Sequence, residues 1–345
     1  HAILDVQQRG EYVYTACGSG GIKVFDAAFI DHKGFSERIV TAPVSPLGQR
    51  LYVPTKYATS IAVPTTMAPN PIRRQLALNQ EPTIPDRYGY IYATDRFQGF
   101  LAVGVATLLD GNPLNNFIQP DDVIQFNPDG LLNDASSVTI VGKYAYVCCP
   151  KGLVVLDIVN PRKPAVVKVV QSGIRNARKI EVQFRFGFLC DDDGMKVLDV
   201  TDLEEPRLVS ALSIADARAV YIGRTYAYIS AGSQGMIIVD VEKPLQPKII
   251  ETFDRHGHIN DLYDIQLGIT NVSEFAYLAD GKNGFHVIQL TDAARSDNGG
   301  FSPVPKPIHI ASYHLHHHGK AYAISKGLDR DRAVDESGAQ IAVFG

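Results

Sequence analysis

The strongest constraint on the fold of this 345-residue chain is a sequence unit that recurs roughly every forty residues. Each unit has an aromatic segment, a short glycine turn, an aliphatic segment that ends in Asp, and a turn that contains Pro. In the clearest copy, these parts begin at Tyr144, Gly152 and Pro161. The same order recurs from Phe186 and from Tyr226. A fixed period of this length is typical of one supersecondary unit stacked on its neighbours.

Alignment on the aromatic segment gives eight copies. They are expected to start near Tyr12, Leu51, Tyr90, Tyr144, Phe186, Tyr226, Phe275 and Ala321. The copy at Leu51 lacks the Gly and the Asp, and a long polar insertion interrupts the copy at Ala321. Because these two copies are degenerate, the alignment leaves seven or eight units open.

Each copy is expected to form four short antiparallel strands. In the copy that contains Tyr226, they are predicted at residues 217–222, 226–231, 236–241 and 247–252. Short glycine turns join the second and third strands, and a turn containing Pro joins the third and fourth. Four strands per unit at this period predict a blade of a β-propeller. The fold class is therefore all-β, a single propeller of seven or eight four-stranded antiparallel blades.

Residues 1–345 are expected to form one propeller domain, because stacked repeats close into a single unit. The chain begins at His1 without an initiator Met, and we interpret it as a fragment of a longer chain. The formal net charge of -4 and the pI near 6.2 argue against nucleic acid as a partner. No apolar run reaches the length of a transmembrane helix, so we expect no membrane span.

Cysteine usage gives no sign of a cofactor site. The four cysteines are Cys17, Cys148, Cys149 and Cys190. Their spacing fits neither a zinc site nor a disulfide framework, and no Cys-x-x-Cys-His motif for covalent haem attachment is present. We expect small, buried residues in tightly packed strands.

The aliphatic segments resemble the repeats of the LVIVD-repeat proteins. The matching segments end at Asp157, Asp199 and Asp240 and read Val-Val-Leu-Asp, Val-Leu-Asp and Ile-Ile-Val-Asp. The resemblance implies a β-propeller and an extracytoplasmic location, either periplasmic or on the cell surface. Some members are similar to propeller domains joined to multihaem c-type cytochromes.

This resemblance implies a protein partner or a flanking domain of the same chain, such as a multihaem cytochrome in electron transfer. We expect no cofactor attached within these residues. Haem c would have to come from flanking sequence or from the partner, and a bound metal ion stays an alternative.

Polar residues open the first strand of several repeats. They are Asp134, Asn176, Asp216 and Asp261. Since the first strand of a blade is innermost, these side chains are predicted to form a polar ring at one mouth of the central channel. Such a ring could bind a cation or ordered water. The alternative is that these residues cap turns by bonding backbone N–H groups.

Histidines gather near the two ends of the chain. The candidate metal ligands are His1, His314, His316, His317 and His318. Imidazole suits zinc, copper and haem iron, and the ends of a closed propeller must meet. The alternative is a solvated histidine-rich loop.

Two further clusters of acidic residues and histidines have both a functional and a structural interpretation. Asp191, Asp192 and Asp193 precede Gly194, but they lack the full spacing of a calcium loop, which favours a hairpin turn. His256, His258, Asp261 and Asp264 could supply acid–base groups, although no nucleophile is placed beside them by sequence.

We identify no catalytic residues and favour a non-catalytic, extracytoplasmic scaffold or docking module beside cytochromes, while the question of enzymatic activity stays open. The alternative is a metal-dependent propeller enzyme with a histidine-rich site at the channel mouth, an analogy at the level of the fold. A carbohydrate-binding module ranks third, because the chain has no Trp and its Tyr residues mostly fall in the repeated strands.

Overall fold

The computed structural model describes most of the chain. The described residues are 2–10, 12–26, 51–64, 77–78, 85–110, 115–270, 273–292, 294–295, 302–315, 319–325, 333–334 and 340–341. The structure is all-β, with short 3-10 helices at η2 (Asp86–Gly89), η3 (Ala106–Leu108), η4 (Pro120–Asp122) and η5 (Pro128–Gly130). Two compact units are distinguished and are described separately. The first comprises His1–Val147, Val155–Val167 and Ser325–Gly345, and the second comprises Cys148–Val154 and Lys168–Ile324.

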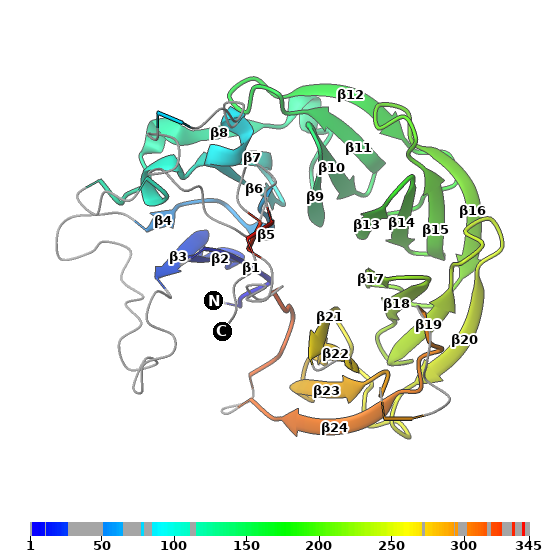
Figure 1. Cartoon of the computed structure of the whole chain (residues 1–345). Coiled ribbons are helices and arrows are strands. Elements are labelled where there is room, and N and C mark those ends of the chain that lie inside the picture. Colours follow the sequence, from blue (N-terminus) through cyan, green and yellow to red (C-terminus); the bar gives the residue numbers. More distant parts are fainter. Residues whose placement is uncertain are drawn as a thin grey trace. The chain divides into compact units, whose positions relative to one another are not determined.

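The described strands form six four-stranded sheets, each in chain order, with every recorded strand pair antiparallel (Figure 1). The first has β1 (Asp5–Arg9), β2 (Tyr12–Ala16), β3 (Ile22–Asp26) and β4 (Tyr52–Val53). The second has β5 (Ala58–Ala62), β6 (Tyr90–Asp95), β7 (Gly99–Gly104) and β8 (Val123–Phe126). The third has β9 (Ser137–Val141), β10 (Tyr144–Cys149), β11 (Gly152–Asp157) and β12 (Ala165–Val170), and its residues are divided between the two units.

The second unit holds the other three sheets. The fourth has β13 (Lys179–Gln183), β14 (Phe186–Asp191), β15 (Gly194–Asp199) and β16 (Arg207–Ser213). The fifth has β17 (Ala219–Gly223), β18 (Tyr226–Ser230), β19 (Met236–Asp240) and β20 (Lys248–Phe253). The sixth has β21 (Asp264–Thr270), β22 (Ser273–Ala279), β23 (Phe285–Gln289) and β24 (Ile308–Tyr313). A separate two-stranded sheet pairs β25 (Ala333–Val334) with β26 (Gln340–Ile341).

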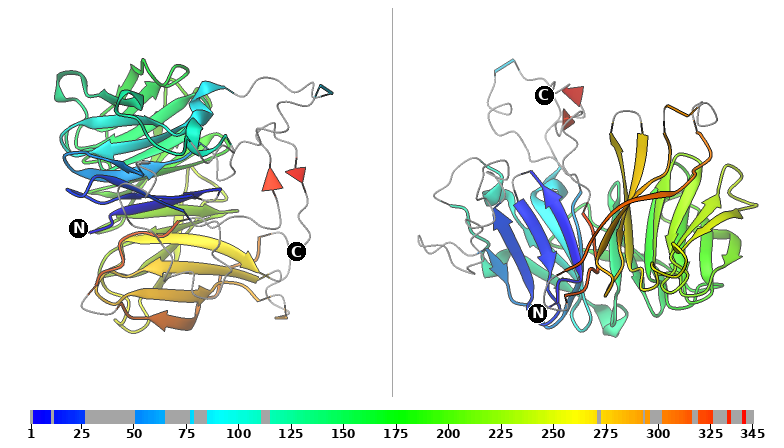
Figure 2. Two further views of the ribbon diagram at one scale, coloured as in Figure 1. Left: turned by 90° about the vertical axis from the view of Figure 1, so that its left-hand side faces the viewer. Right: turned by 90° about the horizontal axis from the view of Figure 1, so that it is seen from below.

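Burial along the middle strands shows that both faces of a sheet are covered. Successive side chains of a strand point to opposite faces, yet every residue of β10 is buried, and so is nearly every residue of β11. Both faces of these middle strands are therefore covered. By contrast, β20 is exposed along most of its length, as expected for a strand at the outer edge. In the second unit, β17 packs beside both β13 and β21, so the first strands of neighbouring sheets lie side by side. Figure 2 shows the strands of these sheets from two further directions.

The third and fourth strands share a recurrent irregularity. The register shifts between Val197 and Leu198, between Ile238 and Val239, and between Val287 and Ile288. A bulge at this place increases the twist between the two outer strands of a sheet.

The predicted strand pattern is correct in its details for the fifth sheet. The four expected segments coincide with β17, β18, β19 and β20 to within two residues at either end. The aromatic residues at the start of β18 are buried, as the packing of repeated aromatic strands requires.

The predicted blade number is wrong, because the described residues form six four-stranded sheets rather than seven or eight. Two of the eight aligned copies are not second strands. Leu51 leads into β4, the fourth strand of the first sheet, and its carbonyl accepts the N–H of Val24 at 3.0 Å. The Tyr-Val pair that follows Leu51 has the composition of an aromatic second strand, but the glycine turn expected after such a strand is missing.

The copy at Ala321 fails for a different reason. Ala321 forms an isolated bridge with Gly281, just as Leu262 does with Gly232 and Ala58 does with Gly18. Leu262 and Ala58 both lie where the chain enters the first strand of a sheet. Ala321 therefore takes a first-strand position rather than a second-strand position, and no four-stranded sheet follows it among the described residues.

Candidate functional site

Three of the four predicted ring residues share an unusual backbone conformation. Asp134, Asn176 and Asp216 have φ values of 55°, 55° and 52°. This left-handed region is open to Asp and Asn because their short polar side chains bond locally. Each of the three lies three positions before the first strand of a sheet, which is β9, β13 or β17. The recurrence of polar residues here is thus tied to a turn that each repeat must make.

In the second unit, two of the four predicted ring residues, Asp216 and Asp261, belong to a continuous chain of alternating charges, and Asn176 Nδ2 donates to a third carboxylate of this chain, Asp192 Oδ1, at 3.1 Å. We call it the polar chain, and its members are Asp192, Arg178, Asp216, Arg218 and Asp261. Arg178 Nη2 lies 2.9 Å from Asp192 Oδ1, and its Nη1 lies 3.1 Å from Asp216 Oδ1. Arg218 Nη2 lies 2.7 Å from Asp216 Oδ2, and its Nη1 lies 3.5 Å from Asp261 Oδ1.

The polar chain joins one sheet to the next. Arg178 precedes β13 and also donates to the carbonyl of Ala217 at 2.9 Å, which precedes β17. Arg218, which precedes β17, donates to the carbonyl of Leu262 at 3.4 Å, which precedes β21. Each arginine therefore bonds both a carboxylate and a backbone carbonyl of the following sheet.

The carboxylates also support the glycine turns of their own sheets. Asp216 Oδ2 lies so close to Gly232 that a Cβ at that glycine would approach it to 2.0 Å. Asp261 packs in the same way against Gly281 and accepts the N–H of Lys282 at 3.3 Å. This is the turn-capping role that we had set against cation binding.

Arg218 has further support from aromatic rings. Its guanidinium lies 4.3 Å from the centre of the Tyr263 ring, and Tyr263 packs edge-on against Tyr322 at 4.8 Å. Burial lowers the pKa of Arg218, but the hydrogen bond and charge of Asp216 outweigh it, so the net pKa is raised. Arg218 is a permanent cation that fixes the position of two carboxylates.

The remaining ring residue, Asp134, lies in the first unit. Arg96 Nε lies 3.2 Å from its carboxylate, and its backbone N–H bonds the carbonyl of Arg96 at 2.7 Å. Arg96 in turn packs over Tyr57 at 4.6 Å. The pair is largely exposed, with about half of each side chain or more in solvent, so it contributes little to stability.

The four ring residues thus bond arginines, an acidic neighbour or turn N–H groups. Sequence reasoning missed Arg178 and Arg218. The signal was present, since Ala-Arg follows both Asn176 and Asp216. Cation binding by the ring stays a prediction. Within the described part of the chain, no group of three or more His, Cys, Asp or Glu residues is arranged to hold a metal ion.

The histidine cluster predicted from sequence falls largely outside the described residues. His1, His316, His317 and His318 are not described. His314 is described and is exposed just after β24. A metal site formed by these residues therefore stays a prediction.

The acid–base cluster predicted from sequence is not assembled as a catalytic group. Asp264 is buried at the start of β21 and accepts Lys179 Nζ at 2.6 Å and the N–H of Ile324 at 3.1 Å. His256 and His258 are exposed in a turn before it. Asp264 therefore ties the start of β13 to the start of β21 within the second unit.

The triplet Asp191–Asp193 forms a hairpin turn, as we favoured. Asp191 is buried, and its Oδ1 accepts the N–H groups of Asp193 and Gly194 at 2.9 and 3.0 Å. Its Oδ2 accepts the N–H of Arg175 at 3.0 Å. Asp95, buried at the corresponding end of β6, accepts the turn N–H groups of Phe97 and Gln98 in the same way, whereas Asp280, buried just after β22, accepts the N–H of Asp261 before β21.

A pair of histidines, of which sequence reasoning missed His286, lies beside Asp280. His286 Nε2 is 3.3 Å from Asp280 Oδ2, and both side chains are buried. The His309 ring packs edge-on against His286 at 5.6 Å. His286 Nδ1 and His309 Nε2 are buried without a hydrogen-bond partner among the described residues. Burial, Arg255 and His286 together lower the pKa of His309.

All four cysteines are free and buried, which confirms the structural interpretation. Burial raises the pKa of the Cys190 and Cys149 thiols. Neither thiol resembles an activated nucleophile, and the residues present do not fit covalent haem attachment.

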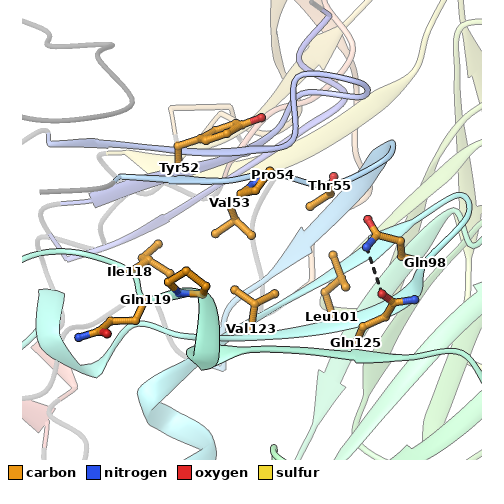
Figure 3. A pocket seen from close by; sticks show the side chains of 11 residues that line it. Tyr52, Val53, Pro54, Thr55, Gln98, Leu101, Ile118, Gln119, Val123 and Gln125 are labelled. Carbon is orange, nitrogen blue, oxygen red and sulfur yellow. Dashed lines mark hydrogen bonds between the residues drawn. The ribbon is translucent and has the colours of Figure 1, made fainter.

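The first unit contains a pocket of about 270 Å³ that sequence reasoning did not foresee. Its wall has residues from β4 and the segment after it, from β7, and from the segment around β8. The lining residues are Tyr52, Val53, Pro54, Thr55, Gln98, Leu101, Ile118, Gln119, Pro120, Val123 and Gln125. Figure 3 shows Val53 pointing toward Leu101 and Val123 across the pocket, with the Gln98 and Gln125 amides at one end.

The floor of the pocket belongs to the hydrophobic core of the first unit. Val53, Leu101 and Ile118 are almost fully buried there, and Val123 packs against them. Gln98 Nε2 donates to Gln125 Oε1 at 3.1 Å, and Gln98 Oε1 accepts the N–H of Lys56 at 2.7 Å. The pocket is thus apolar at its base and polar, but uncharged, at this end.

Comparison with known proteins agrees with this architecture. The LVIVD repeat family model matches residues 133–171 and 215–255, which contain the third and fifth sheets. Among curated proteins, none has a sequence that matches this chain. None of the described segments forms a helix long and apolar enough to cross a membrane.

Solved structures share the fold at low sequence identity. The β-propeller domain of Cps50 (Swd1) from Myceliophteria thermophila has a TM-score of 0.55 and 10% identity, over 96% of this chain and 92% of that one. A chain of a nidogen/laminin complex has a TM-score of 0.51 and 13% identity, over 91% and 97%. The extracellular domain of a hybrid two component system from B. thetaiotaomicron has a TM-score of 0.52 and 14% identity, over 92% of this chain and 36% of that one.

These likenesses define the class of protein: an all-β propeller with four-stranded antiparallel blades. Segments that match the LVIVD repeat supply two of its blades.

Proposed function

We propose that this chain is a non-catalytic, extracytoplasmic propeller that acts as a scaffold or docking module beside multihaem cytochromes in electron transfer. The observation that carries the proposal is the polar chain of the second unit. Asp192, Arg178, Asp216, Arg218 and Asp261 bond one another and the entries of successive sheets. Polar groups used in this way favour a rigid scaffold over a site of acid–base chemistry.

Three further observations support this proposal. Two segments match the LVIVD repeat, and the resemblance to LVIVD-repeat proteins implies, for some members, a link to multihaem cytochromes. One structural neighbour is an extracellular domain. Another is a chain from the crystal structure of a nidogen/laminin complex. At this level of identity the neighbours share the fold alone, so the location and the partner belong to the proposal.

The visible absorption spectrum of the natively isolated full-length protein tests the proposal, recorded before and after addition of dithionite. We expect haem bands that sharpen on reduction and that come from the partner or a flanking domain. The recombinant 345-residue chain is the control and should show no haem bands, since it lacks an attachment motif. A native preparation without haem bands would contradict the cytochrome association.

A further inference from the structure

We propose that the pocket between β4 and the pair β7–β8 binds a small uncharged molecule with an apolar body and one amide or hydroxyl group. This binding site lies in the first unit. It is independent of the docking function, which rests on residues of the second unit.

The size of the pocket sets the size of the ligand. Its volume is about 270 Å³. An apolar cavity of about 150 Å³ binds benzene. A ring with one small substituent therefore fits, whereas a nucleotide or a sugar chain does not.

The lining of the pocket selects against charge. None of its eleven lining residues is ionisable in the neutral range. Two acidic residues, Asp121 and Asp122, are adjacent to lining residues in sequence; Asp122 Oδ1 lies 3.5 Å from Arg162 Nη1, and Arg162 Nη2 bonds the carbonyl of Asp121 at 3.0 Å. A charged ligand would lose its hydration without an oppositely charged side chain in the lining, which is unfavourable.

The polar end of the pocket suits an amide. Each Gln amide has two N–H donors and an oxygen with two lone pairs, so Gln98 and Gln125 can bond a ligand as well as each other. Thr55 Oγ1, in the same wall, is buried without a hydrogen-bond partner among the described residues. A buried hydroxyl in this state costs free energy that a bonded ligand would recover.

The reason for the hollow is the small side chain of Val53. Val53 pairs with Ile22 in β3, just as Phe253 pairs with Met236 in the fifth sheet. Leu212 holds the same place opposite Met195 in the fourth sheet. Phe253 and Leu212 both pack against the cores beside them. Val at this position leaves space that Phe or Leu fills elsewhere in the chain.

The test uses three ligands of nearly equal shape and different charge: benzamide, benzoate and benzamidine. Melting temperature and ligand-observed saturation-transfer NMR are recorded at millimolar concentration. A ligand that binds only the folded state raises the melting temperature with its concentration. We expect benzamide to raise it and to give a saturation-transfer signal, and the two ions to do neither.

Val53→Phe should fill the pocket and abolish the response to benzamide without lowering the melting temperature of the free protein. Val123→Phe fills the pocket from the opposite wall and serves if Val53→Phe does not fold. The matched control is Val166→Phe, on the exposed outer strand β12, which should keep the full response. Equal responses of the wild type and the filled variants, equal responses to all three ligands, or no response of the wild type would overturn the proposal.

Discussion

Arg178 and Asp216 form an ion pair, with Nη1 3.1 Å from Oδ1, between residues that precede the first strands of two neighbouring sheets. The guanidinium is 29% exposed and the carboxylate 39%, so the pair is partly shielded from solvent. It does not act alone. Arg178 also holds Asp192, and Asp216 also holds Arg218. In this way, a repeated polar position becomes a structural connection between blades.

Gly232→Ala should be strongly destabilising. Gly232 has a φ of 50°, and an added Cβ would meet Asp216 Oδ2 at 2.0 Å. We expect a loss of roughly 1–3 kcal/mol in the free energy of unfolding, measured by chemical denaturation. The matched control is Gly257→Ala, because Gly257 also has a positive φ but nothing lies within 4 Å of the added atom. If both variants lose the same free energy of unfolding, the contact with Asp216 does not contribute to the destabilisation.

His309→Leu should remove a pH dependence of stability. Burial, Arg255 and His286 lower the pKa of His309 in the folded protein. The unfolded chain, whose histidines have a pKa near 6.5, therefore takes up the proton first as the pH falls. The contribution of His309 to stability is present above about pH 6.5 and is lost as the pH falls below it.

The measurement is the melting temperature of the wild type and of His309→Leu between pH 8 and pH 5. Leu208 holds the corresponding place opposite Leu198 in the fourth sheet, so Leu is compatible with the strand pairing. The variant should lose less stability on acidification than the wild type. His258→Gln, at an exposed position, is the control and should behave like the wild type. Parallel curves for all three proteins would show that His309 has no such effect.

The native protein should be inert to thiol reagents. Cys17, Cys148, Cys149 and Cys190 are all buried, and burial raises the pKa of the Cys149 and Cys190 thiols. Because the thiolate is the reactive form, we expect less than one equivalent of Ellman's reagent to react under native conditions. Four equivalents should react in denaturant. Rapid reaction of any native thiol would contradict the buried placement.

The sequence was sufficient to predict the four-stranded unit, since strand, glycine turn and terminal Asp recur in order from Tyr144 onward. It was insufficient for the blade number. A Tyr-Val pair at Leu51 and an Ala-Tyr pair at Ala321 have the composition of a second strand, and only pairing shows that they hold other positions. Local composition does not specify which neighbour a strand will pair with.

For the candidate sites too, the repeat predicts which residues recur but not which residues they contact. The positions of Asp216 and Asp261 followed from the repeat, but their bonds to Arg218 depend on how successive sheets approach each other. The pocket could not be predicted, because it results from the volume missing at Val53 between segments distant in sequence. The repeat pattern in the sequence does not predict where a smaller side chain leaves a cavity.

A double-mutant cycle on Arg178 and Asp216 tests the central claim, that the repeated polar residues hold the blades together rather than bind a ligand. Arg178→Met, Asp216→Asn and the double variant are compared with the wild type by chemical denaturation, with and without added calcium. We predict a coupling energy of about 0.5–1 kcal/mol, because both side chains are partly exposed, and no effect of calcium on any of the four proteins. Additive losses, together with stabilisation of the wild type by calcium that Asp216→Asn abolishes, would contradict the account.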